Sequence, residues 1–476
     1  MTKTKKAMAL PHQTEGTEFV ASREAAALFD EQGLGKSKQL IDAIAKQRGE
    51  GTLDGALIIC PNTVKSTWAR EIEAHSTLPC AVFGAGKSAR RQAFGSLRAV
   101  FYVINYEAIA GEVTSLRALL RFKRMALVLD ESHRIKTPGA KVTRAIQRLR
   151  ADAAKRVIMT GTPIANRPDD LWSQMFFLDG GATLGSSFDD FRRRYCTAAG
   201  GYVELDMLRE RLGAVSLRRM KEDALDLPPK TVIPIAVHLK GRQAELYDRM
   251  RKDLYVWVKS LSGEEVLAEA ENILVRLLRL AQLASNPRLL DASYSETPAK
   301  ISALDQLLDE VFSRRPTQKA IIWTSFVGNI PMLCKRYAKY GAIPFYGEID
   351  AVARERALAA FSTDPSVRLF IGNPAAGREG LTLTSANIAI YVDRTFNLVD
   401  YLQSQDRIHR ISQTEACEIY VLIAQSTVDE FIEFSLAQKH RLARYVQQDS
   451  AAVDPADAAL NKPDILRALL VPAHGD

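Results

Sequence analysis

The sequence predicts an α/β protein with two parallel-sheet lobes in tandem, and three observations support this prediction. The chain has 476 residues, which is more than one hydrophobic core accommodates, so two or three domains are expected. Apolar runs of strand length alternate with helical stretches over residues 56–178, and the alternation resumes over residues 319–423. These runs are apolar almost throughout, which indicates strands that are buried on both faces, as in parallel sheets covered by helices.

The expected strands of the first lobe are Ala56–Cys60, Val100–Ile104, Ala126–Leu129 and Val157–Thr160. Those of the second lobe are Ala320–Thr324, Ala342–Phe345, Leu369–Ile371, Ile388–Val392 and Glu418–Leu422. Apolar residues at helical spacing over residues 241–292 predict a helical insertion at the start of the second lobe. We place the first lobe at residues 1–228, the second at 229–448 and a loosely held tail at 449–476, with one short helix near Asp464–Leu470.

The composition, with 47% hydrophobic and 25% charged residues, places the chain among ordinary soluble globular proteins. The longest apolar runs have only strand length, so no membrane span is expected, and the N-terminus lacks the pattern of a secretory signal. Five scattered cysteines show no metal-ligand spacing and are expected to be reduced thiols. Lys and Arg number 64 against 56 Asp and Glu, and this net charge of +8 permits a polyanionic partner without requiring one.

A candidate phosphate loop, Gly33-Leu34-Gly35-Lys36-Ser37, precedes a helix that we expect to begin near Lys38. Backbone N–H groups of such a turn point at phosphate oxygens, and the helix N-terminus adds positive potential. Lys36 would bind the β- and γ-phosphates, and the Ser37 hydroxyl would hold Mg²⁺. The full phosphate-loop pattern is broken at its first position, where Asp30 stands, and a flexible turn that caps a helix is the alternative interpretation.

A second candidate is the acidic pair in Leu127–His133, which reads Leu-Val-Leu-Asp-Glu-Ser-His. Its three apolar residues form a strand that delivers Asp130 and Glu131 at the carboxyl end, where ligands bind in open α/β sheets. Asp130 can reach Mg²⁺ through water, and Glu131 can orient the attacking water and accept its proton. A plain helix N-cap is the alternative, and the phosphate loop earlier in the chain argues against it.

Near the other end of the chain, residues 405–410 read Gln-Asp-Arg-Ile-His-Arg. Arg407 and Arg410 are three residues apart, which predicts that they lie on one helix face. Guanidinium groups are planar, permanently charged and forked, and this suits the equatorial oxygens of a phosphoryl group in transfer. A charged helix face paired internally through Asp406 is the alternative. Since one phosphate-loop domain would not reach so far, the simplest interpretation is two lobes that close on one nucleotide.

Three further polar segments are weaker signals. Thr160-Gly161-Thr162-Pro163 follows a strand, and its hydroxyls can bond to the acidic loop or to a nucleic-acid phosphate, although a simple turn explains it equally. The Gln13 amide can donate one bond to the adenine edge and accept another, which would select ATP over GTP. Residues 377–384 form a glycine-containing turn that could approach a nucleic-acid backbone or the ribose.

The order and spacing of these segments resemble the Swi/Snf-type DNA-dependent ATPases of helicase superfamily two, from about Leu10 to Leu442. Residues 10–16 are similar to the adenine-recognition segment of that family, and residues 30–37 resemble its phosphate loop, which also lacks the first glycine. Residues 130–136 resemble its DEAH box, with Ser132 in place of alanine. Further matches are 58–61 with Trp68 and Glu71 (motif Ia), 160–164 with Asn166, Leu171 and Trp172 (motif III), 217–219 and 227–230 (the segment linking the lobes), 285–287, 321–326 (motif IV) and 402–413 (motif VI).

The resemblance implies two RecA-like lobes and an ATPase, stimulated by double-stranded DNA, that translocates along the duplex and contacts mostly phosphates. It implies ATP and Mg²⁺ as cofactors, with catalysis by Lys36, Asp130, Glu131, Arg407 and Arg410. The implied ATP-binding residues are Gln13, Gly33, Leu34, Gly35, Lys36, Ser37 and Gly380, and the implied metal ligands are Ser37 and Asp130. The implied coupling and DNA-contact residues are His133, Thr160, Thr162 and Gln405.

The chain departs from the family pattern in motif V, where Arg378 and Glu379 stand between Gly377 and Gly380 in place of a Gly-Gly pair. No accessory module is recognisable, as in small prokaryotic or phage members, so we expect a monomer in the cytoplasm of a bacterial cell or a phage-infected host. Replication, repair or defence proteins are conceivable partners. Two alternatives stay open, namely a strand-separating or strand-annealing helicase on forks or R-loops, and a non-hydrolysing DNA-binding scaffold.

Overall fold

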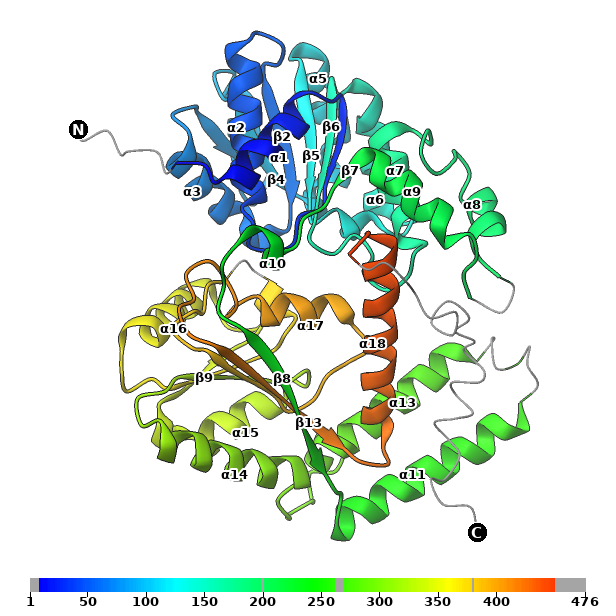
Figure 1. The fold of residues 1–476 in the computed structure, drawn as a ribbon, viewed down its shortest axis with the longest axis vertical. Helices are drawn as coiled ribbons and strands as arrows, with labels where there is room; N and C mark the ends of the chain where they lie inside the picture. The colour runs from blue at the N-terminus through cyan, green and yellow to red at the C-terminus, as the bar shows by residue number, and fades with distance from the viewer. Residues whose placement is uncertain (1–7, 198–200, 262–264, 266–268, 379–380, 450–476) are drawn as a thin grey trace. The chain divides into compact units, whose positions relative to one another are not determined.

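The computed structural model describes residues 8–197, 201–261, 265, 269–378 and 381–449, which form two compact units (Figure 1). The first unit runs to Asp226 and also takes the chain from Arg441 to the end of the described residues, and the second runs from Leu227 to His440. Within the described residues, the chain therefore passes from one unit to the other after Asp226 and again after His440, inside helix α18 (Val428–Val446).

The first unit is built on a seven-stranded sheet with the order β3-β4-β2-β5-β6-β1-β7, and every pair of neighbouring strands is parallel. Its strands are β1 (Ala25–Leu28), β2 (Gly55–Cys60), β3 (Cys80–Val82), β4 (Phe101–Asn105), β5 (Met125–Asp130), β6 (Lys155–Met159) and β7 (Ser216–Leu217). Its helices are α1 (Pro11–Ala21), α2 (Lys36–Gly49), α3 (Lys65–His75), α4 (Lys87–Gly95), α5 (Tyr106–Phe122), α6 (Lys141–Leu149), α7 (Asp170–Asp179), α8 (Phe188–Tyr195), α9 (Leu205–Val215) and α10 (Lys221–Ala224).

Helices cover both faces of this sheet, as the uniformly apolar strands predict. In β2, Leu57 and Ile59 pack with α5, α6 and α7 on one face, whereas Ala56 and Ile58 pack with α2 and α3 on the other. Each strand is therefore buried on both sides, and its polar neighbours can be accommodated only beyond its ends.

The second unit is built on a six-stranded parallel sheet with the order β10-β11-β9-β12-β13-β8. Its strands are β8 (Lys230–Val237), β9 (Ala320–Trp323), β10 (Ala342–Phe345), β11 (Leu369–Gly372), β12 (Ile388–Tyr391) and β13 (Cys417–Ala424). Its helices, besides the first part of α18, are α11 (Gly241–Ser260), α13 (Ala270–Ser285), α14 (Ala299–Arg314), α15 (Asn329–Arg336), α16 (Ala351–Thr363) and α17 (Leu398–Gln405).

The predicted fold class is confirmed, since both units are α/β with parallel sheets and α11 and α13 form a helical insertion near the start of the second unit. All nine predicted strands are present, with ends that differ by a residue or two. All five cysteines lie in the described residues and are free thiols. Among the described residues, none of the helices combines the length and the apolar character needed to cross a bilayer. The helix predicted near Asp464–Leu470 lies outside the described residues.

Two sequence predictions need correction. Helix α2 begins at Lys36 rather than near Lys38, because Gly35 adopts the left-handed conformation that starts the helix there. The prediction that Arg407 and Arg410 share a helix face is wrong, because α17 ends at Gln405 and both arginines lie in the turns that follow. In these turns the Arg407 N–H donates to the Ser404 carbonyl at 3.3 Å, and the Arg407 carbonyl accepts a hydrogen bond from the Leu383 N–H at 2.9 Å.

Candidate nucleotide site

The motifs of the first unit lie at one edge of its sheet. Strands β5, β6 and β1 are neighbours, and the acidic pair, the Thr160–Pro163 turn and the phosphate loop follow their carboxyl ends in that order across the sheet. Parallel strands place these ends side by side, which is where ligands bind in open α/β sheets. The topology therefore brings together three segments that are far apart in the sequence.

The phosphate loop has the backbone that its glycines predict. Gly33 and Gly35 have φ values of 90° and 76°, which side chains with a Cβ atom seldom adopt. A Cβ at Gly35 would also lie 2.4 Å from the Gln13 amide nitrogen, so the Gln13 side chain would have to move to admit it. Lys36 opens α2 and its Nζ donates to the carbonyl oxygens of Asp30 at 2.7 Å and Glu31 at 3.2 Å. Burial lowers the pKa of Lys36, although neighbouring carboxylates oppose this effect.

Asp30 has a structural reason to replace the first glycine of the usual pattern. Its carboxylate is completely buried and accepts hydrogen bonds from Arg219 Nε at 3.0 Å and Arg219 Nη2 at 2.5 Å. The Gln39 amide of α2 adds a third bond at 3.0 Å. Three donors compensate the desolvation of this carboxylate. The aspartate in place of glycine therefore forms a buried ion pair with Arg219 beside the loop.

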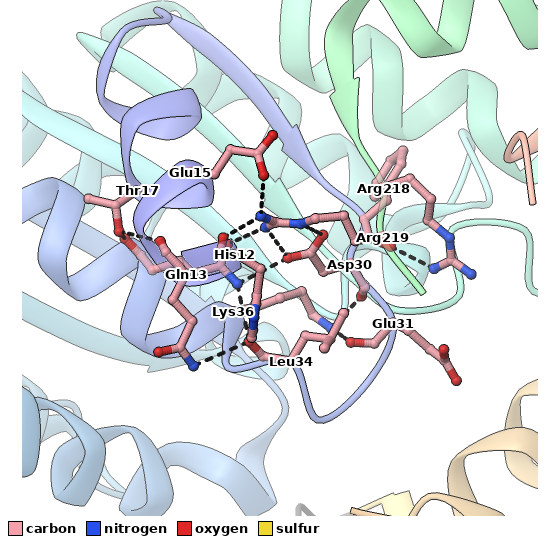
Figure 2. Close-up of polar contacts among 12 residues, drawn as sticks. His12, Gln13, Glu15, Thr17, Asp30, Glu31, Leu34, Lys36, Arg218 and Arg219 are labelled. Atoms are coloured by element: carbon pink, nitrogen blue, oxygen red, sulfur yellow. Dashed lines mark hydrogen bonds and ion pairs between the residues drawn. The ribbon is translucent and has the colours of Figure 1, made fainter. Parts of the chain in front are cut away.

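Helix α1 packs its polar side chains on the same loop (Figure 2). The Leu34 carbonyl is approached by His12 Nε2 at 3.0 Å and by Gln13 Nε2 at 3.5 Å, while Gln13 Oε1 accepts from the Leu10 N–H at 3.1 Å. Gln13 therefore links the start of α1 to the phosphate loop. The sequence did not single out His12, which is buried and makes the shorter of the two contacts.

Asp130 ends β5, and two aromatic side chains fix it from neighbouring elements. The Trp68 indole N–H donates to Asp130 Oδ2 at 2.8 Å, and the Tyr106 hydroxyl donates to the Asp130 carbonyl oxygen at 2.8 Å. Burial, followed by the charge of Glu131, raises the pKa of the Asp130 carboxyl, while the Trp68 bond opposes this rise. A buried carboxylate with so little compensating charge has the environment in which a cation is favoured.

Glu131 has a φ of 54°, an uncommon conformation for a residue other than glycine and one that concentrates at functional sites. Its Oε2 accepts from Thr160 Oγ1 at 3.0 Å, and its Oε1 accepts from Gln32 Nε2 at 3.2 Å. His133 Nδ1 lies 3.4 Å from Glu131 Oε2 and 3.2 Å from Thr160 Oγ1. Burial alone would raise the pKa of Glu131, but His133, Lys36 and Thr160 outweigh it and lower the pKa, so the carboxylate is ionised at neutral pH.

Ser132, the departure from the DEAH sequence, is also explained by a contact. Its hydroxyl is fully buried and donates to Gln174 Oε1 of α7 at 2.7 Å. The Gln174 amide in turn donates to the Pro163 carbonyl at 2.8 Å. Ser132 thus connects the acidic loop to the Thr160–Pro163 turn, where the Thr162 N–H donates to Thr160 Oγ1 at 3.1 Å.

The residues present fit Mg²⁺. This ion prefers oxygen ligands, keeps several waters and is usually bound through one or two carboxylates together with substrate phosphates. Ser37 supplies a hydroxyl at the start of α2, and Asp130 supplies a buried carboxylate at the end of β5. These are the two ligands that the sequence predicts.

The second unit holds the arginines in two different environments. Arg407 is only 2% exposed and donates from Nε to the Gln403 carbonyl at 2.9 Å and from Nη1 to the Leu381 carbonyl at 3.3 Å. Arg410 is partly exposed and donates from Nη1 to Thr382 Oγ1 at 2.9 Å. Gln405 is buried at the end of α17. Thr382 and Leu381 belong to motif V, so motifs V and VI are bonded to each other, whereas Gly380 lies outside the described residues.

The sequence reasoning missed several members of the first-unit site, and the most connected of them is Arg219. Its guanidinium reaches Asp30, Glu15 at 3.2 Å, Gln39 at 3.0 Å and the carbonyl oxygen of His12 (Figure 2). The only sequence signal was that Arg219 is one of two consecutive arginines in the linking segment, opposite an aspartate in a glycine position.

A phosphate loop and an acidic pair at the same edge of one parallel sheet, together with a second parallel sheet whose motifs carry arginines, define the class of two-unit helicase-like ATPases. Residues 12–289 match the family model of the SNF2-related domain, and residues 299–412 match that of the helicase conserved C-terminal domain. The first match covers more than half of the chain, and the chain belongs to the SNF2-related family of helicase-like ATPases. The parallel-sheet units are accordingly its RecA-like lobes.

Individual relatives show the same likeness. The chain is 26% identical to Chromodomain-helicase-DNA-binding protein 1-like of Danio rerio, over 94% of this chain and 45% of the relative. It is also 26% identical to the ATP-dependent helicase MG018 of Mycoplasma genitalium, over 91% of this chain and 42% of the relative. The chain thus spans less than half the length of these curated relatives. Among solved structures, the Sulfolobus solfataricus SWI2/SNF2 ATPase core in complex with dsDNA is 26% identical, with a TM-score of 0.45 over 100% of this chain and 99% of that chain.

Proposed function

We propose that this protein is an ATP-dependent motor that translocates along double-stranded DNA and hydrolyses ATP at the interface of its two RecA-like lobes. The observation that carries the proposal is the arrangement of Lys36, Asp130 and Glu131 at one sheet edge of the first unit. Transfer of a phosphoryl group to water requires a cation that binds the phosphates, a carboxylate that holds the metal ion and an ionised carboxylate that accepts a proton from water. Lys36, Asp130 and Glu131 are the candidates for these three roles.

Each residue has a role that follows from its surroundings. The Gly33 and Gly35 backbone and the N-terminus of α2 bind the β-phosphate, and Lys36 exchanges its carbonyl partners for phosphate oxygens. Ser37 and Asp130 would hold Mg²⁺, which supplies charge neutralisation at the β- and γ-phosphates when bound. Glu131 accepts the proton of the attacking water, and Thr160 and Gln32 fix the orientation of its carboxylate.

The second unit completes the reaction with positive charge. Arg410 is the stronger candidate for stabilising the γ-phosphate in transfer, because its side chain is partly exposed, whereas Arg407 is buried among backbone carbonyls. In this proposal Arg407 shapes the turn, and His133 and Gln405 transmit the nucleotide state towards DNA. Gln13, at the loop, would contact the adenine edge.

Double-stranded DNA is the proposed partner. Family membership and the net charge of +8 support a polyanionic track, and the Sulfolobus core was solved with dsDNA. Contacts to phosphates carry little sequence information, so binding should weaken steeply with salt and show little sequence preference.

The first test is ATP hydrolysis by purified protein with duplex DNA, single-stranded DNA, RNA or no nucleic acid. We expect turnover to rise most with duplex DNA and to be abolished in Glu131→Gln. If phosphate release with saturating duplex DNA is no faster in the wild-type protein than in Glu131→Gln, the protein is a non-hydrolysing scaffold instead.

A second experiment separates translocation from strand separation. The protein is given a triplex whose third strand can be displaced without opening the duplex, and in parallel a forked duplex. Displacement of the third strand without unwinding of the fork supports the translocase. Efficient unwinding of plain duplex, or annealing of its strands, favours the helicase alternative.

A further inference from the structure

The linking segment that follows β7 is attached to the phosphate loop along its length. The Phe29 N–H donates to the Leu217 carbonyl at 2.8 Å, and the Glu31 N–H donates to the Arg219 carbonyl at 3.0 Å. The Lys221 N–H returns a bond to Glu31 Oε2 at 2.8 Å. These bonds continue the parallel pairing of β1 with β7, so the entry to the loop and the linking segment form one hydrogen-bonded ladder.

The two consecutive arginines of this ladder point to opposite sides (Figure 2), as successive side chains of an extended strand do. Arg219 lies on the nucleotide side, where it bonds to buried Asp30, to Gln39 of α2 and to Glu15 of α1. A single guanidinium thus contacts the loop and both helices that flank it. Because its side chain is only 14% exposed and the Asp30 side chain is 0% exposed, a change in the loop must be accommodated by Arg219.

Arg218 lies on the other side and contacts the end of the described chain. Its Nη1 donates to the carbonyl oxygens of Phe29 at 2.6 Å and Gly161 at 3.0 Å. Its Nε and Nη2 form a two-pronged ion pair with Asp449, at 3.0 and 2.7 Å, and the Asp449 side chain is only 2% exposed. A cavity of about 510 Å³ borders this pair, lined by Leu217, Val446 and Gln448 among others.

The linking segment continues into the first passage between the units, after Asp226, and Asp449 follows the second passage, inside α18. The linking segment is therefore bonded to residues 29–31, which lead into the phosphate loop, and Asp449 is connected to them through Arg218. Lys36 holds the carbonyls of Asp30 and Glu31, and a bound triphosphate would compete for Lys36 and release them.

We propose that Arg218 and Arg219 are positioning residues that couple nucleotide binding at the phosphate loop to the two places where the described part of the chain passes between its two units. Arg219 transmits the state of the loop to the linking segment, and Arg218 transmits it to the segment after α18. This inference rests on the proposed ATP-binding function, and it adds a route by which that function reaches the second unit.

The test is hydrogen exchange of the full-length protein with and without a non-hydrolysable ATP analogue and Mg²⁺. In the wild-type protein, we expect the analogue to change exchange at three places: residues 28–37, residues 217–224 and residues 441–449. Arg219→Lys keeps the charge but loses the fork that matches a carboxylate, so the response at 217–224 should disappear while that at 28–37 remains. Arg218→Lys should remove only the response at 441–449.

Arg90→Lys is the matched control, since Arg90 pairs with Glu112 at 2.7 Å in the same unit and touches none of these segments. It should leave all three responses unchanged. Unaltered linker responses in both arginine variants, or no response at 217–224 in the wild-type protein, would overturn the inference. If the analogue leaves residues 28–37 unchanged in the wild-type protein, the proposed nucleotide site itself fails, and this outcome is distinct from the others.

A kinetic measurement complements the exchange data. The ratio of DNA-stimulated to basal turnover should fall by between about 2-fold and about 30-fold in Arg219→Lys, the range that coupling residues show. If Arg219 had a purely structural role, the substitution would lower the fraction of folded protein and reduce both turnover rates by the same factor. The ratio would then be unchanged, and that result would contradict the proposal.

Discussion

The proposed catalytic residues of the first unit and the arginines of the second unit are held in different ways. Lys36, Asp130 and Glu131 are bonded mainly to other elements of the site, such as the Asp30 carbonyl, Trp68 and Thr160. Arg407 and Arg410, by contrast, donate to residues of motif VI and of motif V, namely Gln403, Leu381 and Thr382. The comparison teaches that the candidate site of the first unit is held by several elements, whereas the arginines of the second unit are held by two motifs that are bonded to each other.

The largest expected effect tests which arginine acts on the nucleotide. Arg410→Ala should keep ATP binding and lower DNA-stimulated turnover by about 10³-fold or more, as loss of an arginine finger does. Analogue binding and phosphate release are measured on the same preparation. If turnover equals the wild-type value, Arg410 does not act as an arginine finger, and the second unit then has no demonstrated part in catalysis through this residue.

Glu131→Gln tests the first unit in the same assay. Removal of a general base lowers turnover by about 10²- to 10⁴-fold, and the amide keeps the shape that Thr160 and Gln32 contact. We expect ATP affinity to persist, because Lys36 and the loop are intact. A loss smaller than tenfold would mean that another group accepts the proton.

The pH dependence of the free energy of unfolding tests the interaction between the Asp130 and Glu131 carboxyl groups. Because burial and the Glu131 charge raise the pKa of Asp130 above its unfolded value of 3.8, the folded protein binds more protons than the unfolded chain just above that value. Asp130 therefore contributes stability that declines as pH rises through this window. Glu131→Gln removes the like charge and should flatten the decline, as measured by urea unfolding at pH values above the ordinary pKa of glutamate, where Glu131 is ionised in both the folded and the unfolded wild-type chain. A steeper decline would contradict the assignment.

Arg407 should behave as a structural residue when it is compared with Arg410. Arg407→Gln removes a buried donor from the Leu381 carbonyl, and a buried acceptor left without its partner costs about 1–3 kcal/mol. Urea unfolding of this variant should show the loss, whereas Arg410→Ala should unfold close to the wild-type midpoint. If the two variants are equally stable, the different burial of Arg407 and Arg410 does not give them different structural roles.

The smallest effects are expected for two hydroxyl groups, one beside the acidic pair of the first unit and one beside Arg410 of the second unit. Ser132→Ala removes the bond to Gln174, and Thr382→Val removes the bond to Arg410. The bond between the neutral Ser132 and Gln174 side chains contributes about 0.5–1.5 kcal/mol, so turnover should change by no more than about tenfold in Ser132→Ala. The bond from the charged Arg410 contributes about 1.5–3 kcal/mol, so turnover should change by up to about 150-fold in Thr382→Val. An effect in Ser132→Ala as large as that in Glu131→Gln would show that the acidic loop depends on α7.

The sequence could predict the fold because apolar strands and helical stretches alternate without ambiguity. It missed β8, since this edge strand is half exposed and contains Pro234, which an interior strand would not tolerate. It also missed β1, β3 and β7, which have between two and four residues and carry little periodic signal.

The chemistry-bearing residues were predictable because phosphate loops and acidic strand ends have fixed local spacing. Their partners were not, because Asp30 meets Arg219 only once β1 and β7 are paired. The helix face predicted for Arg407 and Arg410 failed for the same reason. Local spacing favours a helix, but the Leu383 N–H, from a distant segment, takes the Arg407 carbonyl.

The indole of Trp68 gives the molecule a built-in optical probe. It is one of four tryptophans, and its ring nitrogen sits on the carboxylate expected to meet the magnesium ion. Emission from this ring responds to the charge beside it, so arrival of the ion with ATP can be followed in unlabelled protein. Trp68→Phe supplies the blank, and stopped-flow mixing would then time the binding step apart from hydrolysis.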